Sequence, residues 1–215
     1  MRGDSTLLSA DRGRMKCHGR QSPGIAVERV IMGLDLGRKK MAGKRIDLGD
    51  YIRSIPDWPK KGILFRDITP LLAEPKAFAA AIEALVAGYA DAGVEYVAAV
   101  EARGFIFGAA VAEKLGAGFV PIRKKGKLPY KTESITYDLE YGTDTLEVHC
   151  DAVQDGARVL MVDDLLATGG TMAAACELIE KIGGRIVGIT FLIELCELGG
   201  RERLSKYRIN ALIPC

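Results

Sequence analysis

The stretch Val159–Thr171, VLMVDDLLATGGT, joins four apolar residues to two adjacent aspartates and then to a turn of small and hydroxyl residues. The apolar run Val159–Val162 predicts a buried strand, because a short, fully apolar segment bounded by polar residues is typical of a parallel sheet. A helix is predicted to follow over Thr171–Ile182, since Gly183 and Gly184 then provide a stop signal. A strand, a tight turn and a helix in this order indicate an α/β fold.

Strand and helix patterns alternate on both sides of this stretch, from residue 46 to the C-terminus. Helices are predicted after Pro75 and over Phe105–Leu115. Residues 133–150 predict a half-exposed hairpin, because apolar residues alternate along its second half. Further strands are predicted at Tyr96–Val100, Phe119–Ile122, Ile186–Ile193 and Tyr207–Ile213. Together these elements predict one α/β domain over residues 46–215, with a central, mostly parallel sheet flanked by helices.

Composition excludes several classes of protein. Apolar residues make up 48% of the chain and charged residues 27%, so collagen-like and coiled-coil proteins are excluded. The longest apolar run, Gly104–Ala112, spans nine residues, whereas a membrane span needs roughly 18 to 20. The five cysteines are scattered and form no CxxC pair, which argues against a disulfide framework or a zinc site. We therefore expect no membrane association and a cytoplasmic location.

The N-terminal segment differs in charge from the rest of the chain. Residues 1–45 hold 11 Lys and Arg against 4 Asp and Glu, whereas residues 46–215 hold 19 against 24. The segment also has no sustained hydrophobic periodicity, so we expect a basic, disordered extension. It has no interleaved aromatic residues for nucleic-acid binding, and its four acidic residues are unusual in a transit peptide. We therefore expect no nucleic-acid partner, and a functional chain that begins near Met41.

This extension gives a first testable prediction. A chain that starts at Met41 is expected to keep the melting temperature and the activity of the full chain, because residues 1–40 are predicted to bury almost no surface. Limited proteolysis of the native protein is the simplest measurement, and trypsin should cut after Arg12, Arg20 and Arg29. Protection of these three bonds would mean that the extension is docked onto the domain.

The turn after the Val159–Val162 strand has the chemistry of a phosphate and sugar site. Asp163 and Asp164 lie where ligands of open α/β sheets bind, at the carboxyl ends of strands. Small side chains, free backbone N–H groups, two hydroxyls and a helix N-terminus then form an anion cradle. It comprises Ala167, Thr168, Gly169, Gly170 and Thr171. Two carboxylates beside a phosphate would repel it unless they bind sugar hydroxyls or hydrated Mg²⁺. The arrangement therefore predicts a site for a ribose 5-phosphate.

Basic residues follow two other predicted strands at the same edge of the sheet. Arg103 is a permanently charged, planar donor in the turn after the Tyr96–Val100 strand. The cluster at residues 123–127, RKKGK, follows the Phe119–Ile122 strand. A charge run is usually a solvated face, but its place at a strand end favours binding of a polyanion, especially by Arg123 and Lys127.

Five segments of the chain carry a resemblance to a known family. Val159–Thr171 resembles the motif that binds 5-phosphoribosyl 1-diphosphate (PRPP) in type I phosphoribosyltransferases, and its DDLLATGG segment is similar to that of the adenine-specific branch. Four further segments are similar to that branch, in the same order: Pro56–Leu72, Glu101–Gly108, Ile122–Pro129 and Tyr137–Gly142. The resemblance implies the type I phosphoribosyltransferase fold, with a small N-terminal hood at about residues 46–72 and a mobile catalytic loop hairpin at roughly residues 125–140.

The resemblance also implies an activity and roles for individual residues. The activity is transfer of phosphoribosyl from PRPP to adenine, giving AMP and diphosphate in purine salvage, in a cytoplasmic homodimer that uses Mg²⁺. Mg²⁺ would be held through PRPP near Asp163 and Asp164, without a dedicated set of metal ligands, and Ala167–Thr171 would hold the 5′-phosphate. The implied catalytic residues are Glu140, Arg103 and Lys127, with Arg123 also on the diphosphate. The implied adenine-binding residues are Leu64, Phe65, Arg66 and Leu195.

The sequence is also compatible with two other functions. A phosphoribosyltransferase for xanthine, guanine or orotate would use the same aspartate pair and phosphate cradle, so only the hood and Leu195 would differ. A regulator that senses PRPP would keep the fold, but it would not need Glu140 or the basic cluster. Glu140 on its own is also compatible with an exposed strand carboxylate, and Leu64 and Leu195 with core packing.

Overall fold

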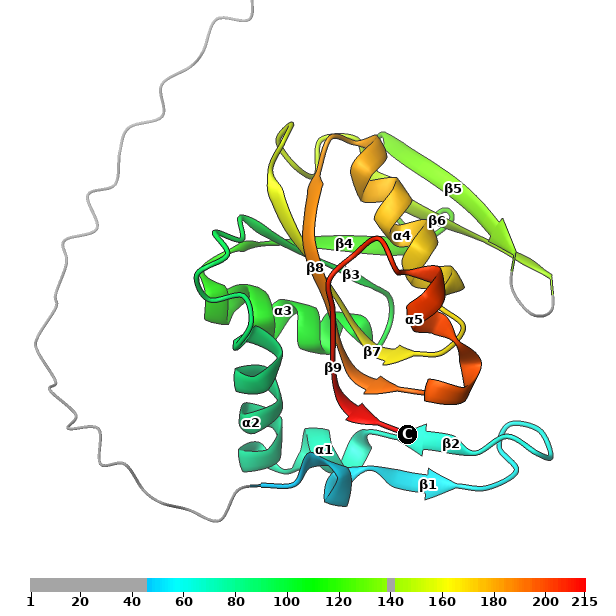
Figure 1. Ribbon diagram of the computed structural model, residues 1–215. Helices are drawn as coiled ribbons and strands as arrows, with labels where there is room; N and C mark the ends of the chain where they lie inside the picture. The colour runs from blue at the N-terminus through cyan, green and yellow to red at the C-terminus, as the bar shows by residue number, and fades with distance from the viewer. Residues whose placement is uncertain (1–45, 139–141) are drawn as a thin grey trace, which may run out of the picture. The chain divides into compact units, whose positions relative to one another are not determined.

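The structure is a computed structural model that describes residues 46–138 and 142–215. Its centre is a seven-stranded sheet in the order β5-β6-β4-β3-β7-β8-β9 (Figure 1). The strands are β3 (Tyr96–Val100), β4 (Gly118–Lys124), β5 (Thr132–Asp138), β6 (Thr143–His149), β7 (Arg158–Leu166), β8 (Arg185–Glu194) and β9 (Ile209–Pro214). The four pairings among β4, β3, β7, β8 and β9 are parallel, whereas β6 pairs antiparallel with both β4 and β5. The prediction of a mostly parallel sheet is confirmed.

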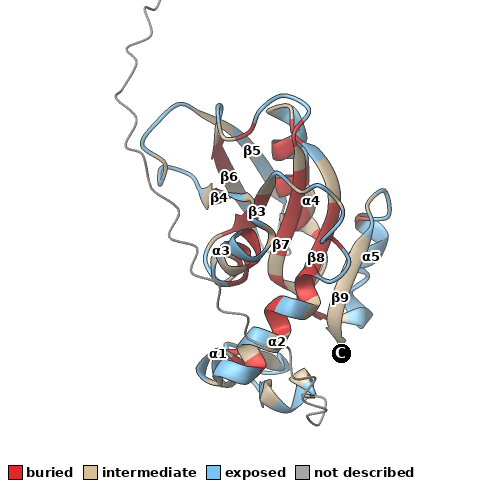
Figure 2. Cartoon of the chain, turned by 90° about the vertical axis from the view of Figure 1, so that its left-hand side faces the viewer, coloured by how far each residue is buried: buried red, intermediate tan, exposed pale blue. Residues whose placement is uncertain are grey.

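Helices cover both faces of the sheet. The longer ones are α2 (Pro75–Val86), α3 (Gly104–Leu115) and α4 (Gly170–Lys181). Alternate residues of β3 separate two apolar clusters, since Ala98 and Val100 pack with α4 and Val97 and Ala99 pack with α2 and α3. Strands β7 and β8 are buried along most of their length (Figure 2). A strand buried on both faces needs a continuous apolar run, which explains why β3, β7 and β8 were predictable.

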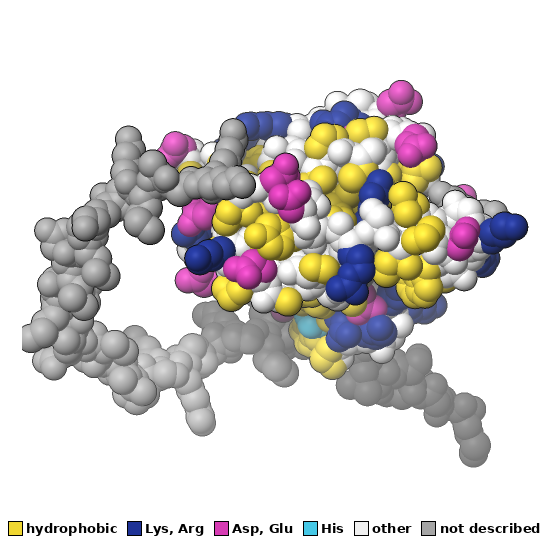
Figure 3. Space-filling model, turned by 90° about the horizontal axis from the view of Figure 1, so that it is seen from below, with side chains coloured by type: hydrophobic (Ala, Val, Ile, Leu, Met, Phe, Trp, Pro, Cys, Tyr) yellow, Lys and Arg dark blue, Asp and Glu magenta, His cyan; other side chains and the backbone are white. Residues whose placement is uncertain are grey.

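The N-terminal part of the described chain forms a small layer that packs against the α2 side of the core, and we call it the hood (residues 46–72). It holds a two-stranded antiparallel sheet of β1 (Arg53–Ile55) and β2 (Phe65–Asp67), together with a 3₁₀ helix, η1 (Leu48–Tyr51), and part of α1 (Thr69–Ala73). The hood exposes three large apolar side chains, Trp58, Ile63 and Leu64. The face of the molecule seen from below carries apolar side chains interspersed with basic and acidic ones (Figure 3).

Two strands are longer than predicted, and this changes where the charged residues lie. The prediction that β7 ends at Val162 is wrong, because pairing with β8 continues from Asp163 opposite Phe191 to Leu166 opposite Glu194. The prediction that the basic cluster follows β4 is wrong for Arg123 and Lys124, which pair with β6 inside the strand. In both strands the apolar run ends before the backbone pairing does, because backbone hydrogen bonds do not depend on the side chain.

The hairpin is confirmed, since β5 and β6 pair from Thr132 opposite His149 to Asp138 opposite Thr143. Residues 132–138, which the resemblance assigned to a loop, therefore form a strand. Glu140 lies outside the described residues. The last strand begins at Ile209, two residues later than predicted, and the short helices η2 (Cys196–Leu198) and α5 (Gly200–Arg203) were not predicted. In the described ranges, no helix is both long and apolar enough to span a bilayer.

Candidate active site

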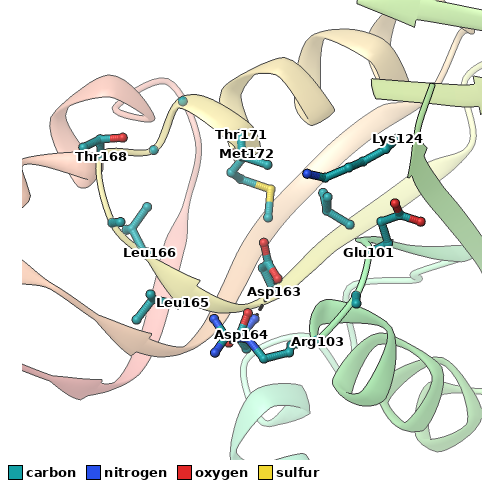
Figure 4. Close-up of a pocket in the computed structure, with 15 residues that line it drawn as sticks. Glu101, Arg103, Lys124, Asp163, Asp164, Leu165, Leu166, Thr168, Thr171 and Met172 are labelled. Carbon is teal, nitrogen blue, oxygen red and sulfur yellow. Dashed lines mark hydrogen bonds and ion pairs between the residues drawn. The ribbon is translucent and has the colours of Figure 1, made fainter. Parts of the chain in front are cut away.

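A cavity of about 440 Å³ opens at the carboxyl edge of the sheet, between the turn after β3 and the turn after β7 (Figure 4). Its lining consists of residues 100–103, Lys124 and residues 163–172. The sequence prediction is therefore correct in one respect: the structure brings the aspartate pair, the small-residue turn and Arg103 together around one cavity.

The aspartates face the cavity because β7 extends beyond its neighbour β3. The pairing of β3 with β7 stops at Ala99 opposite Val162, and the chain of β3 then turns into α3. Asp163 and Asp164 therefore have a β-strand partner on one side only, and the other side is open to the cavity. Gly104, at the start of α3, approaches Asp163 closely from this side. Only a glycine fits there, since a Cβ at position 104 would be 2.6 Å from Oδ1 of Asp163.

The pKa values of both aspartates are raised in the folded protein. Burial, followed by repulsion from Asp164, raises the pKa of Asp163 well above its ordinary value. Burial also raises the pKa of Asp164, although the Arg103 guanidinium opposes this effect. Nε of Arg103 lies 2.8 Å from Oδ2 of Asp164. One cation does not compensate two buried carboxylates, so the pair favours a ligand that brings hydroxyl donors or a further cation.

The turn after β7 is the second part of the site. Gly169 has a φ of 78°, in the left-handed region that glycine adopts readily, and it caps the N-terminus of α4. A second segment supports the turn from behind, because a Cβ on Gly169 would lie 2.8 Å from the Gly200 carbonyl oxygen. A Cβ on Gly200 would in turn overlap the Ala167 carbonyl oxygen. The result is a tight turn at a helix N-terminus, which is suited to a phosphate.

The basic cluster divides into two groups. Nε of Arg123 and Nζ of Lys127 lie 2.9 and 2.7 Å from the two carboxylate oxygens of Glu101, whose side chain is only 7% exposed. Burial would raise the pKa of Glu101, but the hydrogen bonds from Lys127 and Arg123 outweigh it and lower that pKa. Lys124, to which the sequence gave less weight, lines the cavity instead and pairs with Asp144 at 3.1 Å.

The four residues expected to bind adenine are not in the cavity lining. Phe65 makes a cation–π contact with Arg103, which lines the cavity. The guanidinium carbon of Arg103 lies 5.4 Å from the centre of the Phe65 ring. Leu195 follows β8, and its N–H donates to the Leu166 carbonyl at 2.8 Å. Leu64 is 47% exposed, and Arg66 donates to Ser54 Oγ at 2.7 Å. The hood therefore reaches the rim of the cavity through Phe65.

Sequence reasoning assigned no role to Glu101, Tyr137 or Gly200. Glu101 holds two of the predicted cations, and Tyr137 contacts Thr171 of the phosphate cradle. Glu101 and Tyr137 lie in segments that carry the family resemblance, and Gly200 belongs to a Gly199-Gly200 pair in a segment with no predicted element.

A mostly parallel sheet with a carboxylate pair, an anion cradle and basic residues at one edge is the arrangement expected of a phosphoribosyltransferase domain. Comparison with known proteins agrees, since residues 69–211 match the family described as the phosphoribosyl transferase domain. The chain is 56% identical over 170 residues to an adenine phosphoribosyltransferase of Parvibaculum lavamentivorans, covering 79% of this chain and 97% of that relative.

Solved structures are similar over a comparable share of the chain. The adenine phosphoribosyltransferase of Thermoanaerobacter pseudethanolicus matches with a TM-score of 0.75 and 54% identity, covering 78% of this chain and 98% of that one. The enzyme of Giardia lamblia, complexed with 9-deazaadenine, matches with a TM-score of 0.75 and 40% identity, covering 79% and 96%. The chain belongs to the adenine phosphoribosyltransferase family.

Proposed function

We propose that this protein transfers the 5-phosphoribosyl group of PRPP to adenine, producing AMP and diphosphate for purine salvage. The observation that carries the proposal is the single cavity that unites the Asp163–Asp164 pair with the cradle at residues 167–171. Family membership supports adenine as the acceptor, as does the 9-deazaadenine complex of the Giardia lamblia relative.

In this proposal, the two parts of the cavity hold two parts of PRPP. The backbone N–H groups and hydroxyls of residues 167–171 bind the 5′-phosphate, with the α4 N-terminus favouring its charge. Asp163 and Asp164 accept hydrogen bonds from the ribose hydroxyls. These contacts fix the sugar so that its C1 carbon faces the base.

The reaction needs opposite charges on the two sides of that carbon. The bond between C1 and a diphosphate oxygen breaks, a bond from C1 to a ring nitrogen of adenine forms, and that nitrogen loses its proton. Positive charge develops on the ribose and negative charge on the departing diphosphate. Arg103, Arg123 and Lys127 are proposed to stabilise the diphosphate, with Lys124 in the cavity wall.

The site also fits Mg²⁺. Oxygen ligands suit this ion, and it usually keeps several waters while binding one or two carboxylates and substrate phosphates. Within the described ranges, no cluster of three or more His, Cys, Asp or Glu side chains is arranged to hold a metal. Asp163 and Asp164 would therefore contact hydrated Mg²⁺ that arrives with PRPP, and the ion would neutralise charge on the diphosphate.

Base specificity gives the direct test of this function. With PRPP and Mg²⁺, adenine should be converted to AMP, whereas hypoxanthine and guanine should be poor acceptors. Their oxo group places an acceptor where the proposed adenine site presents a partner for a donor, and an unpaired buried polar group costs roughly 1–3 kcal/mol. This corresponds to about tenfold to a hundredfold discrimination in kcat/KM. Comparable rates with guanine would refute adenine specificity but not phosphoribosyl transfer.

We propose Glu140 as the residue that faces the developing positive charge. Glu140→Gln keeps the size of the side chain and removes its charge, so kcat should fall while the KM for PRPP stays nearly unchanged. That pattern identifies an interaction made chiefly in the transition state. Steady-state kinetics would assign Glu140 to the surface if kcat were unchanged.

We also propose that the protein is a cytoplasmic homodimer. The family resemblance supports both statements. Light scattering of the purified protein should give twice the chain mass of 23.2 kDa. A monomer that retains full activity would refute the dimer without affecting the proposed reaction.

A further inference from the structure

The hairpin touches the phosphate cradle through one pair of hydroxyls. The Tyr137 hydroxyl, near the end of β5, lies 3.2 Å from Oγ1 of Thr171 in the first turn of α4. The Tyr137 side chain is partly buried and packs against the apolar cluster on the α4 face of the sheet. Thr171 lines the cavity, whereas Tyr137 does not. Tyr137 therefore contacts a cavity-lining residue without lining the cavity itself.

The direction of this hydrogen bond decides what Thr171 can do. A hydroxyl has one hydrogen to donate, so a Thr171 that donates to Tyr137 has none for a phosphate. If Tyr137 donates to Thr171 instead, the Thr171 hydrogen is free to point into the cavity. The heavy-atom geometry permits either direction, and a phosphate, which only accepts, selects the second.

We propose that Tyr137 is a positioning residue for the 5′-phosphate: its hydroxyl donates to Thr171 Oγ1 and thereby directs the Thr171 hydrogen toward the phosphate. This inference rests on the proposed function, since it assumes a phosphate in the cradle at residues 167–171. The chain of donors runs from the phenol to the threonine hydroxyl to the phosphate oxygen, and each bond polarises the next.

The chemistry of the two hydroxyls favours Tyr137 as the donor. Burial raises the pKa of Tyr137 above its ordinary value of 10, so the phenol keeps its proton at neutral pH. A phenol is also a stronger acid than an aliphatic alcohol, so it is the better donor of the two.

The test is calorimetric titration of the full chain with ribose 5-phosphate and, separately, with adenine. Tyr137→Phe keeps the ring in the apolar cluster and removes the hydroxyl, so the Kd for ribose 5-phosphate should rise about 3- to 10-fold, as expected for one hydrogen bond. The Kd for adenine should not change. Tyr96→Phe is the matched control, because Tyr96 packs against the same apolar cluster. It is the first residue of β3 and therefore lies at the amino-terminal end of the strand, whereas the cavity lies at the carboxyl end.

A double-mutant cycle separates positioning from a general structural effect. If Tyr137 acts through Thr171, then Tyr137→Phe combined with Thr171→Val should bind ribose 5-phosphate no more weakly than Thr171→Val alone. Additive losses in the double variant, or unchanged binding by Tyr137→Phe, would overturn the proposal. Absence of ribose 5-phosphate binding by the unmodified protein would instead refute the cradle itself, and with it the proposed function.

Discussion

Asp163→Asn and Asp164→Asn are each expected to lower kcat/KM by about 100-fold or more, because the carboxylates position the ribose and the metal for reaction. An amide keeps the shape of the carboxyl group but loses the charge and one acceptor oxygen. Arg103 keeps access to solvent in the Asp164 variant, since its side chain is 37% exposed. The loss should therefore appear in turnover and not in folding.

The same variants carry a prediction about stability against pH. The folded protein raises the pKa of Asp163, so in the pH range between the ordinary aspartate pKa of about 4 and the raised value the folded state binds more protons than the unfolded state. Stability contributed by this group is therefore present at low pH and lost as pH rises through that range. Asp163→Asn should lack this decline and should be at least as stable as the unmodified protein at neutral pH.

Denaturant unfolding at several pH values, combined with turnover, tests both statements. Asp151→Asn is a matched control, since Asp151 is an exposed aspartate that does not line the cavity. A folded Asp163 or Asp164 variant with the activity of the unmodified protein would mean that the site has been assigned to the wrong residues.

Gly200→Ala is expected to destabilise the fold and to damage the phosphate cradle at the same time. A Cβ at this position would overlap the Ala167 carbonyl oxygen and lie 2.8 Å from a methyl carbon of Leu166. Relief requires the backbone to move, and overpacking of this kind typically costs about 1–3 kcal/mol of unfolding free energy. Because Ala167 begins the cradle, the Kd for ribose 5-phosphate should rise as well.

Gly88→Ala is the matched control for this substitution. A Cβ on Gly88 would meet only the end of the flexible Arg208 side chain, at 3.2 Å. Thermal unfolding and ribose 5-phosphate titration should therefore change little for Gly88→Ala and substantially for Gly200→Ala. If the two variants behaved alike, Gly200 would not support the cradle.

The sequence predicts those features that depend on local pattern. The buried strands β3, β7 and β8 each contain a short, mostly apolar run, and the residues around Asp163 and Asp164 form a contiguous motif. The ends of β4 and β7 were misplaced, because pairing with a neighbouring strand continues after the apolar pattern stops.

Contacts between distant segments were not predictable in the same way. Gly200 packs closely against Ala167, which lies 33 positions earlier in the chain. Glu101 forms ion pairs with Arg123 and Lys127, which follow on another strand and its turn. Such contacts depend on how the strands are ordered in the sheet. The basic cluster therefore suggested a free diphosphate site, whereas the structure adds a buried carboxylate between two of its cations.

A crystal structure of the protein with AMP tests the central claim most directly, namely that one cavity holds the 5-phosphoribosyl group. We expect the phosphate in the turn at residues 167–171, the ribose hydroxyls on Asp163 and Asp164, and the base directed toward Phe65 of the hood. A phosphate bound at Arg123 and Lys127, with the aspartate pair making no contact to the sugar, would contradict the account.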